Sequence, residues 1–305
     1  MKDFRWFFVF FLWQVLLFLL AYIVVTDLNI RQAINKNRVL PSPIAQKSVT
    51  SYPVLKKDRN PNISALAAVV VDDDSKTLLF SKNPTLLLSM ASTTKIMTAM
   101  VALSYYKMTE VLTIHSNIVD GAKIGFNRGQ KVKFEDLLYA MLLPSANDAA
   151  LAIAQNYPGG ESAFVDKMNE FAKVFHLNNT RFGDIAGLLD NKGYTTPLDL
   201  ARLASVALKN KVFARIVETK RKDISDIDNK NIYSLFNLNK LLGIDGVNGV
   251  KTGYTDEAGQ VLVTSKKEKG HTIIAVVMGS SDRFSDTKEL LSLISGNVNY
   301  LSIHP

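Results

Sequence analysis

The apolar positions of this 305-residue chain first gather in one long run near the N-terminus. Residues Trp6–Val25 are apolar except for Gln14, and the run matches the roughly 20 residues that cross a bilayer as a helix. A cleavable signal peptide has a shorter apolar core and small residues at its cleavage site, and neither feature is present. We therefore predict that residues 1–26 form an uncleaved transmembrane signal-anchor.

The pattern then loses its periodicity. Residues 27–61 are polar and contain four prolines, a composition typical of an extended tether. Regular patterns of apolar positions begin near Ile63. The sequence therefore predicts a linker over residues 27–61 and one folded domain over residues 62–305.

Strand patterns begin and end this domain, and helix patterns lie between them. Ala65–Val71 and Thr77–Ser81 flank an acidic turn, which predicts a hairpin; three adjacent aspartates in such a turn are more typical of a turn than of a metal site. The next predicted elements are helices, of which one opens at Ser92, one opens at Thr195–Asp199 and three span Phe134–Leu143, Asp148–Tyr157 and Gly159–Leu177. Three strands are predicted over Gly249–Tyr254, Gly259–Ser265 and His271–Gly279, and a last helix over Ser285–Ile294. This order predicts an α/β fold, with one antiparallel sheet built from both chain ends, flanked by helices and interrupted by a helical region.

Three short motifs in this framework carry candidate chemistry. They are S-x-x-K at Ser92–Lys95, S-x-N at Ser145–Asn147 and K-T-G at Lys251–Gly253. Each motif alone is weak, since S-x-x-K recurs at Ser104–Lys107 and at Ser285–Lys288. Only the first copy follows an apolar approach and opens a helical pattern, where backbone N–H groups and the positive end of the helix dipole are available.

The spacing of the first motif has a chemical reason. Residues three apart on a helix share a face, so the Lys95 amine can lie against the Ser92 hydroxyl. A serine needs a base to become a nucleophile, and a lysine can be that base only where burial and nearby cations lower its pKa. Lys251 would supply such a cation and attract a substrate carboxylate, while Ser145 and Asn147 would relay the proton to the leaving amine. The motifs predict a serine acyl-transferase that works without a histidine base.

Composition excludes several other classes of protein. There is no cysteine, so disulfides, thiolate metal sites and a catalytic cysteine are excluded. The four histidines have no metal-ligand spacing, and the sequence contains no G-x-S-x-G motif, so we expect no metal and no cofactor. The net charge of +8 comes from dispersed basic residues. This dispersion argues against nucleic-acid binding and fits either attraction to anionic membrane or wall polymers or an ordinary solvated surface.

These motifs and their surroundings resemble the low-molecular-mass penicillin-binding proteins that act as D-alanyl-D-alanine carboxypeptidases. The resemblance covers roughly residues 62–295. The matching segments are Met90–Ala99, Leu137–Ala150, Tyr194–Thr196 with Asp199 and Leu200, Asn237–Leu242, Gly249–Thr255 and Arg283–Leu291. It implies a β-lactamase/transpeptidase-like fold. The chain departs from many members of the family at Gly193, where they carry histidine.

The resemblance also implies roles for single residues. Ser92 would be the nucleophile and Lys95 its base, and Ser145 and Asn147 would assist proton transfer and hold the acyl group. Lys251, Thr252 and Gly253 would bind substrate from the strand. Tyr254 would also bind substrate, and its backbone N–H would join that of Ser92 in an oxyanion hole. Arg283 would lie near the substrate carboxylate.

The resemblance predicts removal of D-alanine from peptidoglycan stem peptides that end in D-Ala-D-Ala, with β-lactams as covalent inhibitors. The alternatives are a D-alanyl-D-alanine endopeptidase, a serine β-lactamase and an inactive wall-binding protein. Class A β-lactamases add a glutamate in E-x-x-L-N, and Glu161, Glu170 and Glu218 all lack the Leu-Asn.

The same reading predicts where the protein works. Lys2 and Arg5 on the short side of the apolar run favour a cytoplasmic N-terminus, although basic residues also follow the run. The chemistry belongs outside the membrane, so we expect a single-pass protein of the cytoplasmic membrane with an extracytoplasmic catalytic domain. The chain ends soon after that domain, so we expect the N-terminal helix to be the anchor.

Overall fold

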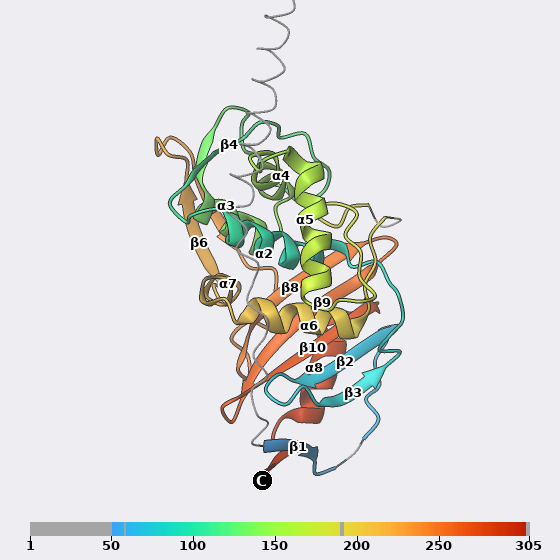
Figure 1. The fold of residues 1–305 in the computed structure, drawn as a ribbon. Helices are drawn as coiled ribbons and strands as arrows, with labels where there is room; N and C mark the ends of the chain where they lie inside the picture. Colours follow the sequence, from blue (N-terminus) through green and yellow to red (C-terminus); the bar gives the residue numbers. More distant parts are fainter. Residues whose placement is uncertain (1–50, 58, 190–191, 303–305) are drawn as a thin grey trace, which may run out of the picture. The chain divides into compact units, whose positions relative to one another are not determined.

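Five antiparallel strands from both ends of the domain form its central sheet, as the sequence predicted. The computed structural model describes residues 51–57, 59–189 and 192–302. The strand order in the sheet is β3-β2-β10-β9-β8 (Figure 1). The bounds are Ala67–Asp72 for β2, Leu78–Lys82 for β3, Val247–Thr255 for β8, Gly259–Glu268 for β9 and His271–Ser280 for β10.

Helices cover both faces of this sheet, because its central strands are apolar on both sides. In β10, Val276 faces the larger core and Val277 the smaller one, as the period of two in a strand requires. Helix α6 (Pro197–Leu208) packs on the first face and α8 (Arg283–Ile294) on the second. Helix α8 begins two residues before the predicted start, since the Asp282 side chain caps it by accepting from two backbone N–H groups.

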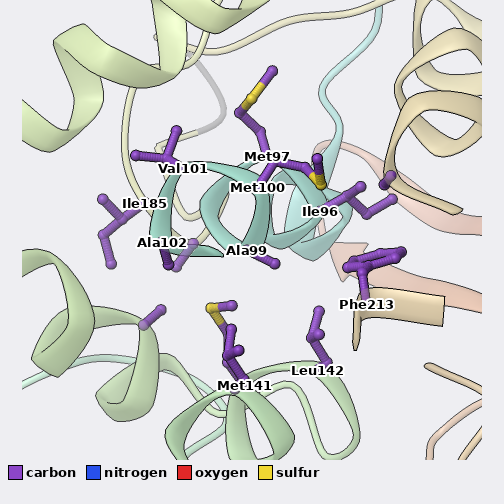
Figure 2. Close-up of a cluster of buried hydrophobic side chains, with 14 of the residues drawn as sticks. Ile96, Met97, Ala99, Met100, Val101, Ala102, Met141, Leu142, Ile185 and Phe213 are labelled. Carbon is purple, nitrogen blue, oxygen red and sulfur yellow. The ribbon is translucent and has the colours of Figure 1, made fainter. Parts of the chain in front are cut away.

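The inserted helical region surrounds one almost fully buried helix, α2 (Lys95–Tyr105). Figure 2 shows Ile96, Met97, Met100 and Val101 of α2 among apolar side chains of other segments. The other helices of this region are α3 (Phe134–Leu142), α4 (Asn147–Gln155), α5 (Gly160–Val174) and α7 (Lys211–Val217). The apolar pattern predicted α2 to α5 because their buried faces recur at the helical period.

Two small hairpins lie outside the predicted elements. They pair β4 (Val111–Thr113) with β5 (Lys131–Lys133), and β6 (Arg221–Ser225) with β7 (Ile232–Phe236). Strand β6 buries only Ile224. With one buried position, a strand has too little alternation for its sequence to predict it.

A further strand lies inside the segment predicted to be a linker. Strand β1 (Ser51–Leu55) pairs antiparallel with β11 (Val298–Ser302), so that Ser51 stands opposite Ser302. Only Pro53 of β1 is buried, and the partner strand comes from the opposite end of the domain. Local sequence therefore carried no signal of this pairing, and the folded part begins before residue 62.

The predicted transmembrane segment, residues 1–26, lies outside the described residues. Within the ranges that the structure describes, no helix is long and apolar enough to cross a bilayer.

In the acidic turn after β2, the Asp72 carboxylate accepts from the Ser75 backbone N–H at 2.8 Å and from the Tyr300 hydroxyl at 2.9 Å.

Candidate active site

Ser92 and Lys95 are in direct contact. Ser92 lies in a short 3-10 helix, η1 (Ala91–Thr94), and Lys95 is the first residue of α2. The two side chains lie on one face, as their spacing predicted, and Nζ of Lys95 is 2.8 Å from Oγ of Ser92. This is hydrogen-bond distance, which lets the hydroxyl pass a proton to an unprotonated amine.

The environment of Lys95 favours the unprotonated amine. Its side chain is completely buried, and burial lowers its pKa from 10.5 to about 7, although the Asp184 carboxylate raises it. The amine also donates to the Ala186 carbonyl at 3.1 Å. A pKa near neutrality leaves a large fraction of the amine free to accept a proton at physiological pH.

Lys251 of β8 interacts electrostatically with Lys95. It is 2% exposed, and its Nζ donates to the Thr252 carbonyl at 3.0 Å. Burial lowers its pKa most, followed by the positive charges of Lys95 and Arg283. Lys251 is therefore coupled electrostatically to Lys95, but the lowering of the Lys95 pKa comes from burial rather than from Lys251, and an anionic ligand there would favour the charged form of Lys251.

Strand β8 approaches the backbone of Ser92 at Gly253. A Cβ atom on Gly253 would lie 3.2 Å from both the Ser92 nitrogen and the Met90 carbonyl oxygen. Glycine at this position thus lets the K-T-G strand lie directly against η1. Tyr254 follows as an exposed residue, and its hydroxyl donates to Asp256 at 2.8 Å.

Arg283 joins this strand from the first turn of α8. Its Nη1 donates to the Gly253 carbonyl at 2.8 Å, and its guanidinium lies over the Phe284 ring, 5.1 Å from the centroid. The buried Nε has no hydrogen-bond partner among the described residues. Arg283 is therefore held next to the K-T-G motif with a donor still available.

The S-x-N motif lies in the turn between α3 and α4. The Asn147 amide donates to the Asp120 carbonyl at 2.6 Å, while its Oδ1 and the Ser145 hydroxyl are buried with no hydrogen-bond partner within the described ranges. The structure therefore shows no hydrogen bond that closes the predicted relay from Ser145 to Ser92 or Lys95. Two unpaired buried oxygens are costly in a folded protein, and both retain unused capacity to accept a hydrogen bond.

Two carboxylates near these motifs were given no role from the sequence. Asp148 accepts the backbone N–H groups of Ile124, Gly125 and Phe126, and Asp184 accepts those of the turn that contacts Lys95. Each carboxylate fixes a loop beside the site. Asp184 stands three residues before a glycine, a signal of a tight turn, but the sequence did not connect that turn to Lys95.

Comparisons with known proteins point to one family. Residues 55–282 match the family described as D-alanyl-D-alanine carboxypeptidase. A carboxypeptidase of Streptomyces sp. strain K15 is 33% identical over 254 residues, which cover 76% of this chain and 87% of that protein. The carboxypeptidase DacF of Bacillus subtilis is 31% identical over 249 residues, 79% of this chain and 64% of the relative.

A solved structure extends the likeness to the fold. The crystal structure of the Streptomyces K15 DD-transpeptidase superposes with a TM-score of 0.74 at 33% identity, covering 77% of this chain and 98% of that one. This confirms the predicted transpeptidase-like arrangement of an antiparallel sheet flanked by helices. Both the sequence match over most of the chain and the shared fold place the protein among known enzymes: it belongs to the D-alanyl-D-alanine carboxypeptidase family.

Proposed function

We propose that this protein removes the terminal D-alanine from peptidoglycan stem peptides through an acyl-enzyme on Ser92. The observation that carries the proposal is the 2.8 Å contact between the Ser92 hydroxyl and the buried Lys95 amine. A hydroxyl paired with an amine whose pKa is about 7 is an activated nucleophile at neutral pH.

The reaction follows from this contact. Oγ of Ser92 attacks the carbonyl carbon of the penultimate D-alanine while its proton passes to Nζ of Lys95. The C–N bond of the tetrahedral intermediate then breaks, and the leaving D-alanine takes a proton through the Ser145 hydroxyl. Water attacks the resulting ester and restores Ser92.

Binding of the substrate carboxylate is assigned to the cationic side of the site. Lys251, Thr252 and Arg283 stand together along β8 and the start of α8, where a carboxylate would neutralise two adjacent positive charges. The backbone N–H groups of Ser92 and Tyr254 are assigned to the oxyanion hole. Removal of one such donor typically lowers kcat by about 10²–10³-fold.

We predict that penicillin acylates the protein in a rapid burst and that this acyl-enzyme is hydrolysed slowly, while peptide is turned over continuously. The opened β-lactam keeps its leaving group attached, which blocks the approach of water, whereas D-alanine diffuses away. The measurement is stopped-flow acylation by a fluorescent penicillin beside D-alanine release from a pentapeptide. Rapid multiple turnover of penicillin without D-alanine release would instead support a β-lactamase.

A second candidate function is an endopeptidase that cuts cross-linked stem peptides. Relatives of Pseudomonas aeruginosa and Escherichia coli that are 33% and 31% identical are named D-alanyl-D-alanine endopeptidases. The two activities use the same nucleophile and differ in the group that leaves. Mass spectrometry of products from free pentapeptide and from cross-linked muropeptides, incubated separately, distinguishes them.

We further place the catalytic domain outside the cytoplasmic membrane, anchored by residues 1–26. The apolar run Trp6–Val25 supports this placement. We predict that the full chain sediments with membranes and that limited proteolysis releases an active domain. Because β1 begins at Ser51, the new N-termini should map to residues 27–50. A mature protein whose first residue lies beyond Thr26 before any protease is added would mean a cleaved signal peptide.

A further inference from the structure

We propose that Asp184 is a positioning residue for the base of this reaction: its carboxylate fixes the turn Asp184–Leu189 against α2 and thereby presents the Ala186 carbonyl to the Lys95 amine. This inference rests on the proposed function, in which Lys95 accepts the proton of Ser92. Asp184 touches neither the reacting hydroxyl nor the K-T-G strand in any described contact, so it acts through Lys95.

The carboxylate of Asp184 organises the turn almost alone. One oxygen accepts the backbone N–H groups of Ala186 at 2.6 Å and Gly187 at 2.5 Å. The other accepts those of Leu188 at 3.0 Å and Leu189 at 2.7 Å. Four charge-assisted bonds to consecutive residues leave the turn one conformation.

This turn contacts α2 through two hydrogen bonds. The Ala186 carbonyl accepts from Nζ of Lys95 at 3.1 Å, and the Ile185 carbonyl accepts from the Thr98 hydroxyl at 2.7 Å. Both acceptors lie next to each other in the turn, and both donors lie on one face of the helix. The position of the Lys95 amine is thus tied to the conformation that Asp184 imposes.

Close packing makes this link rigid. A Cβ atom on Gly187 would lie 1.9 Å from the Ala91 carbonyl oxygen, and Gly187 has a φ of +77°. The turn therefore contacts η1 without an intervening side chain. A change in the conformation of the turn at Asp184 therefore changes the packing against η1 and the start of α2, which carry Ser92 and Lys95.

The charge of Asp184 adds a second effect on the same amine. Asp184 raises the Lys95 pKa against the larger lowering by burial. Among the described residues, the other charged groups coupled to this pair are Lys251 of β8, whose pKa burial and then the Lys95 charge lower, and Glu161 of α5, whose pKa burial and Asp184 raise. Asp184 is thus the anion that keeps the buried amine basic.

The test is the pH dependence of acylation in the full-length Asp184→Asn variant, solubilised in detergent. Asparagine has the shape of aspartate but no charge, and it can accept only part of the four N–H bonds. We expect the acid limb of the acylation rate, measured with a fluorescent penicillin, to move to lower pH. The plateau rate should fall about tenfold, because a less basic, less well-placed amine is a weaker general base.

Asp199→Asn is the matched control. Asp199 is a buried carboxylate at the end of the same connection, and it accepts the Asn179 backbone N–H at 2.7 Å. It has no described contact with Lys95. This variant should lose thermal stability without moving the midpoint of the acid limb. An equal midpoint in wild type and Asp184→Asn would overturn the proposal.

A second measurement separates this inference from the proposed function. The 13Cε resonance of Lys95, assigned with a Lys95→Met variant, reports protonation of the amine without any turnover. We expect its midpoint to be lower in Asp184→Asn than in wild type, and an unchanged midpoint would contradict the role of Asp184. If wild type were not labelled by penicillin, the proposed function would fail while this titration still decided the role of Asp184.

Discussion

Replacement of Ser92 by alanine is expected to abolish both D-alanine release and covalent labelling by penicillin. Among the described residues, the variant removes the only oxygen in hydrogen-bond contact with Nζ of Lys95 that can form an acyl bond, since the other partner is a backbone carbonyl. Loss of the nucleophile in serine hydrolases lowers kcat by on the order of 10⁶-fold. Gel fluorescence with a labelled penicillin and a D-alanine assay measure the two losses.

The chain offers a close control on α2, the helix that follows η1. Ser104 also begins an S-x-x-K sequence, but its hydroxyl donates to the Val101 carbonyl at 2.7 Å. Ser104→Ala should therefore retain labelling and turnover. Labelling that persisted in Ser92→Ala, with the adduct mapped by mass spectrometry to another residue, would move the nucleophile.

Replacement of Lys95 by methionine is the second large effect that we expect. Methionine has nearly the length of lysine and suits a buried site, but it cannot accept a proton. General-base catalysis typically contributes 10²–10⁴-fold, so we expect acylation by penicillin to slow by about that factor. Cooperative thermal unfolding of the variant would show that the loss is chemical rather than structural.

The pH profile of wild type gives the sign of this effect. Because the pKa of Lys95 is lowered to about 7, the amine is protonated and inactive as a base below that pH and free above it. The acylation rate should therefore rise through a midpoint near pH 7 and then level off. In Lys95→Met this rise should vanish, and a wild-type rate that stayed constant from pH 5 to 8 would exclude Lys95 as the base.

The parts of the site that the sequence predicted depend on local geometry. Contact between Ser92 and Lys95 requires only a helical turn, and the motif itself contains that information. The sheet from both chain ends was predictable because β2, β9 and β10 contain apolar runs bounded by turn residues, and their order along the chain limits the possible topologies. The assigned roles of Ser145, Asn147 and Tyr254 stay predictions.

What the sequence did not reveal depends on tertiary contacts. Asp184 is one aspartate in an irregular segment, and its importance comes from the turn it folds and from the helix that this turn meets. Strand β1 has one buried residue, and its partner β11 comes from the opposite end of the domain. Neither feature has a period or a motif, so no pattern along the chain could predict it.

The pairing of β1 with β11 also determines how the domain bears mechanical load. Tension that travels along the chain from its N-terminal side reaches the domain first at Ser51, whose partner Ser302 is at the end of a five-residue ladder. A load that pulls across the strands opens the ladder one pair at a time, because it acts on the terminal pair before the others. The two-stranded sheet contains no strand of the central sheet, so it can yield first while Ser92, Lys95 and β8 keep their positions.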